Sequence, residues 1–385
     1  MTGKLFTDSF LPMIPAILPE LRRQFALSLT KGVAVIFALQ LAANLIQLLT
    51  GHLRSTEKRP LISLIGLALV GSLSLVGLVP GPPIALPIII ILAVLTGCGD
   101  GMYNPEGLRA IHRLHRIPPA LGSSLFLSSG FAGFAFGAWA SAFLLTRFGL
   151  KGLLILPLFP LASLAIIVLL RVRLFVEQIP ANENAPLSVQ KPLPLWPVVV
   201  MATIAAISSN IISWLTPTRL NELGFELTFG GFAVTMFCLG AMFGSFFWAA
   251  AAHKFGDIPC SIIAVLLGTP LTILYLLNIE ARAAVWLLFA LGFCSLAGYS
   301  LMVTMARRAG AANLGRRISI IIGGVWGIAC LAMMALGPVA DRFGVKFVLN
   351  FAPLGYLLAA LVGLAILLHT RSRRPATISS PSQSA

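Results

Sequence analysis

Two acidic residues stand inside long apolar segments of the chain, where an ionised side chain is costly. Asp100 follows an uncharged apolar run from Ile84 to Leu95, and Asp8 lies in a proline-bearing apolar segment near the N-terminus. An apolar helix needs about 20 residues to cross the hydrocarbon core, so both carboxylates are expected within a membrane. Of the 12 acids in the chain, only these two fall well inside a predicted span. We therefore expect Asp8 and Asp100 to take up and release protons.

The segment around Asp8 is predicted to be a broken helix. Asp8 precedes the outer helix end near Pro19 by about ten residues, or roughly 15 Å, which places it close to the bilayer midplane. Pro12 has no N–H, so the Asp8 carbonyl loses the hydrogen bond that it would accept in a regular helix. A carboxylate beside a freed carbonyl is typical of broken transport helices. The alternative is that Asp8 only packs between helices.

The stretch from Gly97 to Arg109, GCGDGMYNPEGLR, holds the second acid. Tyr103 and Asn104 share a helix face with Asp100 at the i+3 and i+4 positions. Pro105 crowds the preceding turn, so the helix is expected to bend or open there. The glycines of the stretch permit close helix contact, which would make it a packing seam with a kink. The other interpretation is a pore-lining segment in which Asp100 is a coupling acid or a substrate contact.

Further polar and aromatic residues at predicted midspan positions are candidates for lining a substrate cavity. Asn210 and Trp214 occupy the region of the seventh span that corresponds to Asp8, and Tyr299 follows Asn104 at an offset of 195 residues. Gln40 and Asn44 lie at helical spacing in the second span, where bonds between helices are a slightly favoured alternative. The complete set of candidates is Gln40, Asn44, Tyr103, Asn104, Asn210, Trp214 and Tyr299.

The composition indicates a polytopic membrane protein. Of its 385 residues, 58% are hydrophobic and 10% are charged, whereas soluble domains carry about 25% charged residues. The formal charge of +15 does not indicate nucleic-acid binding, because the basic residues lie in short loops between apolar segments. The five cysteines lack metal-ligand spacing, and no phosphate-binding glycine motif or catalytic constellation is present. The sequence therefore predicts no enzyme activity, no cofactor and no metal site.

Apolar periodicity predicts an all-α fold with twelve transmembrane helices. The spans are expected at 4–21, 29–52, 61–79, 84–106, 119–145, 151–170, 195–217, 227–252, 258–277, 283–306, 317–340 and 346–369. With the N-terminus inside, 18 of the 27 basic residues fall in inner loops and tails. This bias predicts that both termini are cytoplasmic. We expect an integral protein of a bacterial-type inner (plasma) membrane.

The two halves of the chain repeat. TRFGLKG at Thr146 to Gly152 recurs as DRFGVKF at Asp341 to Phe347, and Gly97 and Gly292 keep the same offset of 195 residues. A same-sense repeat of six spans predicts a pseudo-two-fold axis along the membrane normal. The predicted domains are an N-terminal six-helix bundle (1–170), a cytoplasmic linker (171–194), a C-terminal six-helix bundle (195–370) and a disordered cytoplasmic tail (371–385).

Twelve spans, a repeat of six and a basic loop after the second span resemble the major facilitator superfamily. In that loop, Gly51, Leu53, Lys58, Arg59 and Pro60 match the signature of the family, whereas Arg54 and Glu57 replace an acid and a glycine. The segments Asp8 to Ser28 and Gly101 to Gly107 resemble the fosmidomycin-resistance-type efflux branch. The resemblance implies a proton-driven carrier, and this branch is associated chiefly with efflux.

The loop also suggests a latch between states. Glu106, at the inner end of the fourth span, is expected to pair with the basic loop or with Arg109. The predicted latch comprises Gly51, Arg54, Lys58, Arg59 and Glu106. In the fifth span, Gly130, Gly133 and Gly137 form a small-residue face for close packing.

The favoured hypothesis is a secondary carrier that exports a small organic compound against proton entry by alternating access. We expect a neutral or cationic substrate, because no Lys or Arg lies deep in any predicted span. The expected partners are the substrate, protons and the lipid bilayer, and we expect a monomer. The alternatives are a proton-coupled nutrient importer and a transporter-like membrane sensor or scaffold without transport.

Overall fold

The computed structural model describes residues 2–52, 61–82, 84–111, 119–170, 193–306, 317 and 320–372, and every regular element in these ranges is a helix. The first half contains α1 (Thr2–Asp8), α2 (Met13–Phe25), α3 (Leu29–His52), α4 (Leu61–Val70), η1 (Gly71–Leu78), α5 (Ala85–Ile111), α6 (Pro119–Phe148), η2 (Leu150–Ile155) and α7 (Leu158–Leu169). The second half contains α8 (Leu195–Glu222), α9 (Leu227–Phe255), α10 (Asp257–Leu277), η3 (Arg282–Ala284), α11 (Val285–Leu291), η4 (Gly292–Leu296), α12 (Ala297–Ala306), η6 (Ile320–Gly324), α14 (Val325–Phe343), α15 (Val345–Leu349) and α16 (Ala352–Ser372).

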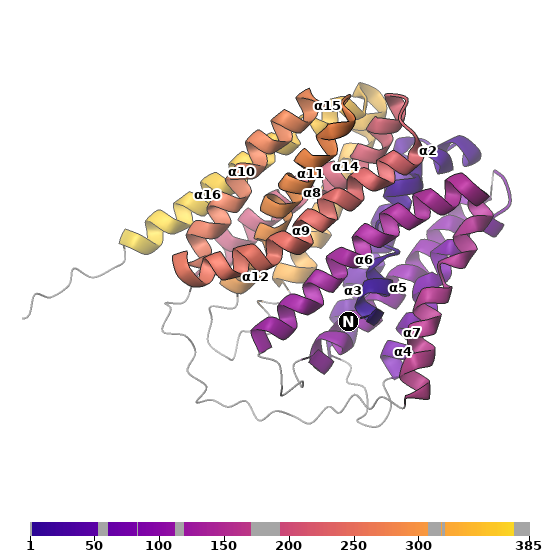
Figure 1. Ribbon diagram of the computed structural model, residues 1–385, viewed down its shortest axis with the longest axis horizontal. Coiled ribbons are helices and arrows are strands. Elements are labelled where there is room, and N and C mark those ends of the chain that lie inside the picture. Colours follow the sequence, from indigo (N-terminus) through magenta and orange to yellow (C-terminus); the bar gives the residue numbers. More distant parts are fainter. Residues whose placement is uncertain are drawn as a thin grey trace, which may run out of the picture.

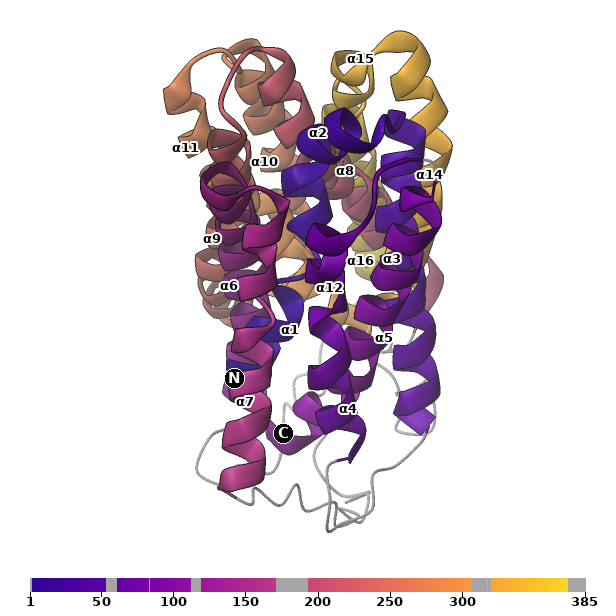
Figure 2. The same ribbon diagram turned by 90° about the vertical axis from the view of Figure 1, so that its right-hand side faces the viewer.

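Eleven helical segments in the described part of the chain are long and apolar enough to cross a membrane. They coincide with the second to twelfth predicted spans, and α1 with α2 forms the first. The helices stand side by side in a bundle (Figures 1 and 2). The predicted fold class, an all-α polytopic membrane protein with twelve spans, is confirmed. The predicted linker and tail lie outside the described residues, apart from Leu193 and Pro194 of the linker and Arg371 and Ser372 of the tail.

The first crossing is interrupted where the sequence predicts it. α1 ends at Asp8 and α2 begins at Met13, so Pro12 occupies the N-cap of the second piece. The predicted free carbonyl is wrong, however. The backbone between the two pieces forms a tight turn in which Leu11 N donates to the Asp8 carbonyl at 3.3 Å. The tighter i+3 bond replaces the i+4 bond that Pro12 cannot donate.

The fourth crossing does not open at Pro105, so that part of the prediction is wrong, and the bend stays a prediction. α5 continues for six residues beyond the proline, to Ile111. Pro105 leaves the Gly101 carbonyl without its helical N–H donor. The Thr50 hydroxyl of α3 donates to that carbonyl at 2.9 Å. A hydroxyl from a neighbouring helix thus satisfies the freed carbonyl, as is common in membrane helices.

The glycines of the Gly97 to Arg109 stretch form a packing seam. A Cβ added at Gly97 would overlap the Leu39 carbonyl of α3, and one added at Gly99 would lie 2.5 Å from the Val70 N of α4. In the second half, a Cβ at Gly292 would overlap the Phe237 carbonyl of α9. Gly97 and Gly292 therefore let the fourth and tenth crossings approach the second and eighth. This correspondence agrees with the sequence repeat.

The two halves meet mainly along α3 with α14 and α6 with α9, and α2 also packs against α8 and α9. α2 and α15 lie at the same end of the molecule (Figure 2), next to the start of α3 and the end of α14. There the Asp341 carboxylate of α14 accepts hydrogen bonds from the Leu29 and Thr30 N–H groups at the start of α3, each at 2.8 Å. The Thr30 hydroxyl also donates to Asp341. An acid of one half therefore caps a helix of the other.

Candidate functional site

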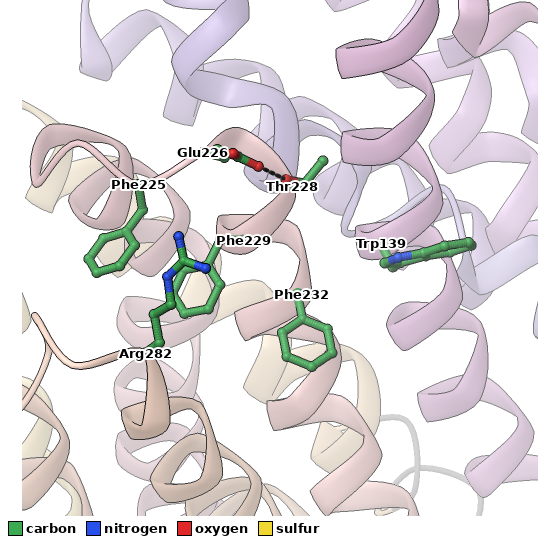
Figure 3. A pocket seen from close by; sticks show the side chains of 7 residues that line it. All are labelled: Trp139, Phe225, Glu226, Thr228, Phe229, Phe232 and Arg282. Atoms are coloured by element: carbon green, nitrogen blue, oxygen red, sulfur yellow. Dashed lines mark hydrogen bonds between the residues drawn. The ribbon is translucent and has the colours of Figure 1, made fainter.

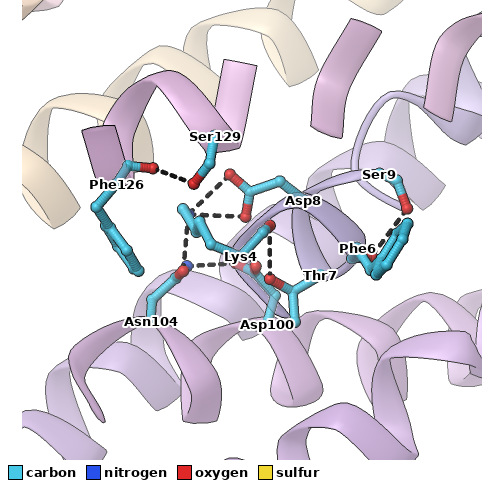
Figure 4. Close-up of polar contacts among 9 residues, drawn as sticks. All are labelled: Lys4, Phe6, Thr7, Asp8, Ser9, Asp100, Asn104, Phe126 and Ser129. Atoms are coloured by element: carbon cyan, nitrogen blue, oxygen red, sulfur yellow. Dashed lines mark hydrogen bonds and ion pairs between the residues drawn. The ribbon is translucent and has the colours of Figure 1, made fainter. Parts of the chain in front are cut away.

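A buried cluster joins α1 to α5 (Figure 4). The Lys4 ammonium donates to Asp8 Oδ1 at 2.7 Å and to Asn104 Oδ1 at 2.7 Å. The Asn104 amide donates in turn to Asp100 Oδ2 at 3.0 Å. Asp8 and Asp100 are 4% and 2% exposed, and Lys4 is 8% exposed. The structure thus brings together three of the predicted site residues, Asp8, Asp100 and Asn104, around a lysine.

Lys4 corrects an expectation from the sequence. Lys4 is the first residue of the predicted span 4–21, and no Lys or Arg is expected deep in a span. In the structure α1 begins at Thr2 and Lys4 is buried between α1, α5 and α6. The overlooked signal is its spacing, because Lys4 and Asp8 are four residues apart and so share a helix face.

A row of glycines on α6 makes room for the cluster. A Cβ at Gly130 would lie 2.5 Å from Asp8 Oδ2 and 3.0 Å from Lys4 Cε. At Gly133 and Gly137 a Cβ would overlap the carbonyl oxygens of Leu5 and Ser9, respectively. The predicted small-residue face of the fifth span is therefore confirmed, and α1 lies directly against it.

An aromatic ring closes the cluster on the side of α6. The Lys4 ammonium lies 5.3 Å from the centre of the Phe126 ring, within range of a cation–π interaction. Tyr103, another predicted site residue, is 8% exposed, and a Cβ at Gly3 of α1 would overlap its hydroxyl. The tyrosine thus packs beside the cluster, and the site is largely shielded from solvent.

The charges in the cluster do not balance when every group is ionised. Two carboxylates and one ammonium leave a net charge of −1, with Asn104 as a neutral bridge. The Asp100 Oδ1 atom is buried and has no hydrogen-bond partner among the described residues. One proton bound to a carboxylate would make the cluster neutral. Bound to Asp100 Oδ1, it would turn this oxygen into a hydroxyl. With both acids ionised, the cluster is therefore one proton short of neutrality.

The remaining cavity candidates are spread over several helices. The Asn44 and Asn210 side-chain amides each have a buried Nδ2 without a hydrogen-bond partner in the described structure. Gln40 is half-buried, and Trp214 is 5% exposed within the apolar core. The Tyr299 hydroxyl donates to the Ile321 carbonyl of the π-helical segment η6 at 2.8 Å, and its ring meets Trp326 edge-on. Tyr299 thus connects two helices.

The predicted latch falls mainly on residues outside the described ranges, namely Arg54, Lys58 and Arg59. Gly51 lies in the last turn of α3. Glu106 is 2% exposed and interacts with a neighbouring group. The pairing of Glu106 with the basic loop stays a prediction.

Two contacts between helices could not be predicted from the sequence. Asp341 and Thr30 are 311 residues apart, and Thr50 and Gly101 are 51 residues apart. Neither pair follows a local periodicity, so only the folded arrangement of the helices reveals it. Among the described residues, no group of three or more His, Cys, Asp or Glu side chains could hold a metal ion.

Comparisons with known proteins agree with this architecture. The Major Facilitator Superfamily profile matches residues 5–321. The uncharacterized MFS-type transporter YfnC of Bacillus subtilis (strain 168) is 22% identical over 374 residues, which cover 93% of this chain and 90% of that protein.

Solved transporter structures share the fold. A bacterial homolog of the human lysosomal transporter Spinster, in an inward-facing and occupied conformation, has a TM-score of 0.70 at 14% identity and covers 98% of this chain and 97% of its own. A D-xylose–proton symporter has a TM-score of 0.67 at 14% identity, and the match covers 95% of this chain and 94% of the symporter. At these identities the likeness concerns the fold alone, and no comparison confirms the fosmidomycin-resistance branch. With a profile match over most of its length and this twelve-span fold, the chain belongs to the Major Facilitator Superfamily and is a secondary transporter rather than an enzyme.

Proposed function

We propose that the protein is a proton-coupled carrier in which the cluster of Lys4, Asp8, Asn104 and Asp100 is the proton site. The observation that supports this is the unbalanced buried charge, with an unpartnered oxygen on Asp100. A buried ion pair is tolerated when its hydrogen bonds are satisfied, whereas an extra buried charge is strongly unfavourable. A proton on either carboxyl removes that extra charge.

Proton binding would couple to transport through differential affinity. A state in which the cluster is shielded from water favours the protonated form, and a state in which it is hydrated favours the ionised form. Each cycle between the two states would then move a proton across the membrane. The rocking of two halves about a central site provides the change in access.

The substrate class follows from the same charges. Lys4 is the only basic residue in the buried set of the described chain, and its ammonium already contacts Asp8 and Asn104. The site thus has no spare positive charge for an anion. A small neutral or cationic organic compound fits it better, with the free amide donors of Asn44 and Asn210 as candidate contacts.

We further propose export as the direction, with both termini in the cytoplasm of a bacterial-type cell and the monomer as the working unit. Export rests on the resemblance of two helix segments to an efflux branch. The orientation rests on the distribution of basic residues. Because the similar D-xylose–proton symporter shares the fold, a proton-coupled importer is the alternative that the assay must separate.

The first test is spectroscopic and requires no substrate. Infrared difference spectra of the purified protein between acid and neutral pH should contain a carboxylic acid C=O band from the cluster. We expect Asp8→Asn or Asp100→Asn to remove or shift that band. Glu222→Gln is the matched control, since Glu222 is a half-exposed acid that pairs with Arg219. A band that both cluster variants leave unchanged would show that these acids do not titrate.

The second test measures transport in vesicles with an imposed pH gradient. Compounds to which expression confers tolerance, beginning with the organic cation ethidium, supply the probe. Asp8→Asn should permit exchange of the probe but abolish its uphill movement, whereas Glu222→Gln should do neither. Uphill transport by the double variant Asp8→Asn/Asp100→Asn would refute proton coupling through this cluster. Uphill movement together with protons, instead of against them, would identify an importer.

A further inference from the structure

A pocket lies at the seam between the two halves, lined by residues that are distant in the sequence from the cluster of Lys4, Asp8, Asn104 and Asp100 (Figure 3). It has a volume of about 240 Å³ and is lined by Trp139 of α6, by Thr228, Phe229 and Phe232 of α9, by Phe225 and Glu226 just before α9, and by Arg282 of η3. One charge of each sign and four aromatic rings thus surround it. None of these residues takes part in the proposed proton site.

The polar and apolar parts of the pocket occupy different depths. Glu226 directly precedes the span Leu227–Phe255, and Arg282 begins the span Arg282–Ala306. Both charges therefore lie at the level where the apolar helices end. Phe232 and Trp139 lie within spans and are 38% and 44% exposed. A pocket with charges at the membrane–water interface and partly exposed aromatic side chains deeper in the membrane suits an amphiphile oriented like a membrane lipid.

The arginine in this pocket is available for an anion. Its guanidinium carbon lies 6.0 Å from the centre of the Phe229 ring, and Phe229 stacks on Phe225 at 4.9 Å. The rings hold the guanidinium in place, but Arg282 donates no hydrogen bond within the described chain. An Arg guanidinium presents five N–H donors in a planar fork that matches phosphate oxygens.

The acid supplies the complementary contact. Glu226 Oε2 accepts a hydrogen bond from the Thr228 hydroxyl at 3.2 Å, which leaves its other oxygen free. A carboxylate can accept several donors, and a primary ammonium offers three. Glu226 and Arg282 are both exposed at the rim, so a zwitterion can reach both of them.

We propose that this pocket binds the headgroup of a phospholipid with a primary ammonium, such as phosphatidylethanolamine. Its phosphate lies on Arg282, its ammonium on Glu226, and its acyl chains run along Phe232 and Trp139. At about 30 Å³ per water, the pocket holds the equivalent of roughly eight water molecules, which is space for a headgroup but not for whole acyl chains, so the chains leave the pocket past Phe232 and Trp139. Because Trp139 belongs to one half and the other lining residues to the second, the lipid bridges the halves at their seam.

Native mass spectrometry of the purified protein tests this assignment. Phosphatidylethanolamine is compared with phosphatidylcholine, whose ammonium cannot donate hydrogen bonds, and with phosphatidylglycerol, whose headgroup has no ammonium. We expect Arg282→Gln to weaken phosphatidylethanolamine binding about five-fold, as befits one ion pair at an aqueous boundary. Glu226→Gln should remove the preference for ethanolamine over choline. Arg219→Gln, an arginine outside the pocket, is the matched control and should bind like the unmodified protein.

Fluorescence locates the bound lipid. Phosphatidylethanolamine with brominated chains should quench the part of the tryptophan emission that Trp139→Phe removes, and Arg282→Gln should reduce this quenching. The proposal is overturned if Arg282→Gln retains the lipid as well as Arg219→Gln does, or if choline and ethanolamine lipids bind equally. Quenching that is the same with and without Trp139 would also overturn it.

Discussion

The buried Lys4–Asp8 pair leads to a prediction about charge balance. The two side chains are 11% and 5% exposed, and their charged atoms are 2.7 Å apart. Lys4→Gln removes the only cation of the cluster and leaves Asp8 and Asp100 to face each other. Removing one partner of a buried ion pair costs about 3–5 kcal/mol.

An independent estimate of the stability that Lys4→Gln loses gives a similar value. The cluster of the Lys4→Gln variant can become neutral if it takes up one additional proton. Protonating an ordinary aspartate at pH 7 costs about 4 kcal/mol, which therefore limits the loss of stability. At roughly 2 °C per kcal/mol, the apparent melting temperature should fall by about 6–10 °C.

A second substitution should restore the stability. Lys4→Gln/Asp8→Asn leaves Asp100 as the single acid, so the cluster needs no more protons than the unmodified one. Neutral replacements of a whole buried pair are often tolerated. We therefore expect the double variant to melt closer to the unmodified protein than to Lys4→Gln. Arg219→Gln breaks the more exposed pair with Glu222 at 3.2 Å and should change stability by less than about 1 kcal/mol.

The pH dependence supplies a second readout. Folded Lys4→Gln binds more protons than its unfolded chain, so its stability rises as the pH falls, by up to about 1.4 kcal/mol per pH unit. Thermal unfolding in detergent between pH 5 and 8 measures both effects. If the double variant is as unstable as Lys4→Gln, or if the deficit of Lys4→Gln is the same at pH 5 and pH 8, the charge-balance argument is wrong.

Two further predictions concern helix contacts. Asp341→Asn removes the charge that caps α3 across the seam and should weaken the contact by about 1–2 kcal/mol. Spin labels at the ends of α3 and α14 should then show that the ratio of separated to closed halves rises about 5- to 30-fold. Populations equal to those of the neighbouring variant Arg342→Gln would contradict this. Gly133→Ala places a Cβ on the Leu5 carbonyl and should lower the free energy of unfolding by about 1–3 kcal/mol. Thermal unfolding measures this loss against the control Gly327→Ala, where nothing lies within 4 Å of the new Cβ. Equal melting temperatures would show that α1 can move away from α6.

The sequence predicted the fold well because membrane helices obey a local rule. Each crossing requires a long apolar segment, so eleven predicted spans coincide with described helical segments. The break before Met13 and the glycine faces were also predictable, since proline and glycine act through their own backbone. The consequence of each proline was less predictable, because Thr50 and Leu11 supply replacement hydrogen bonds from positions that composition does not reveal.

The candidate site was predicted only in part. Asp8, Asp100 and Asn104 were identified because polar groups inside apolar segments are costly and therefore conspicuous. Lys4 was missed because the helix start could not be fixed within a few residues, and one turn decides between a tail and a buried position. The distances between the acids also depend on how close α1 lies to α6, which three glycines set in the folded protein.

The break in the first crossing lies between the proposed proton site and the helix that reaches the other half of the protein. α1 carries Lys4 and Asp8 and packs mainly against α6, with smaller contacts to α5 and α7. α2 packs against α3 and α6 of the first half and against α8 and α9 of the second. The turn at residues 9–12 joins these two pieces. A change of charge at Asp8 acts on the last residue of α1, directly where the chain changes direction. A continuous helix would transmit such a change only as a tilt of the whole rod, whereas the break lets α1 and α2 change their packing separately. In the proposed mechanism, the turn before Met13 is therefore the stretch of backbone that joins Asp8 to the helix in contact with both halves.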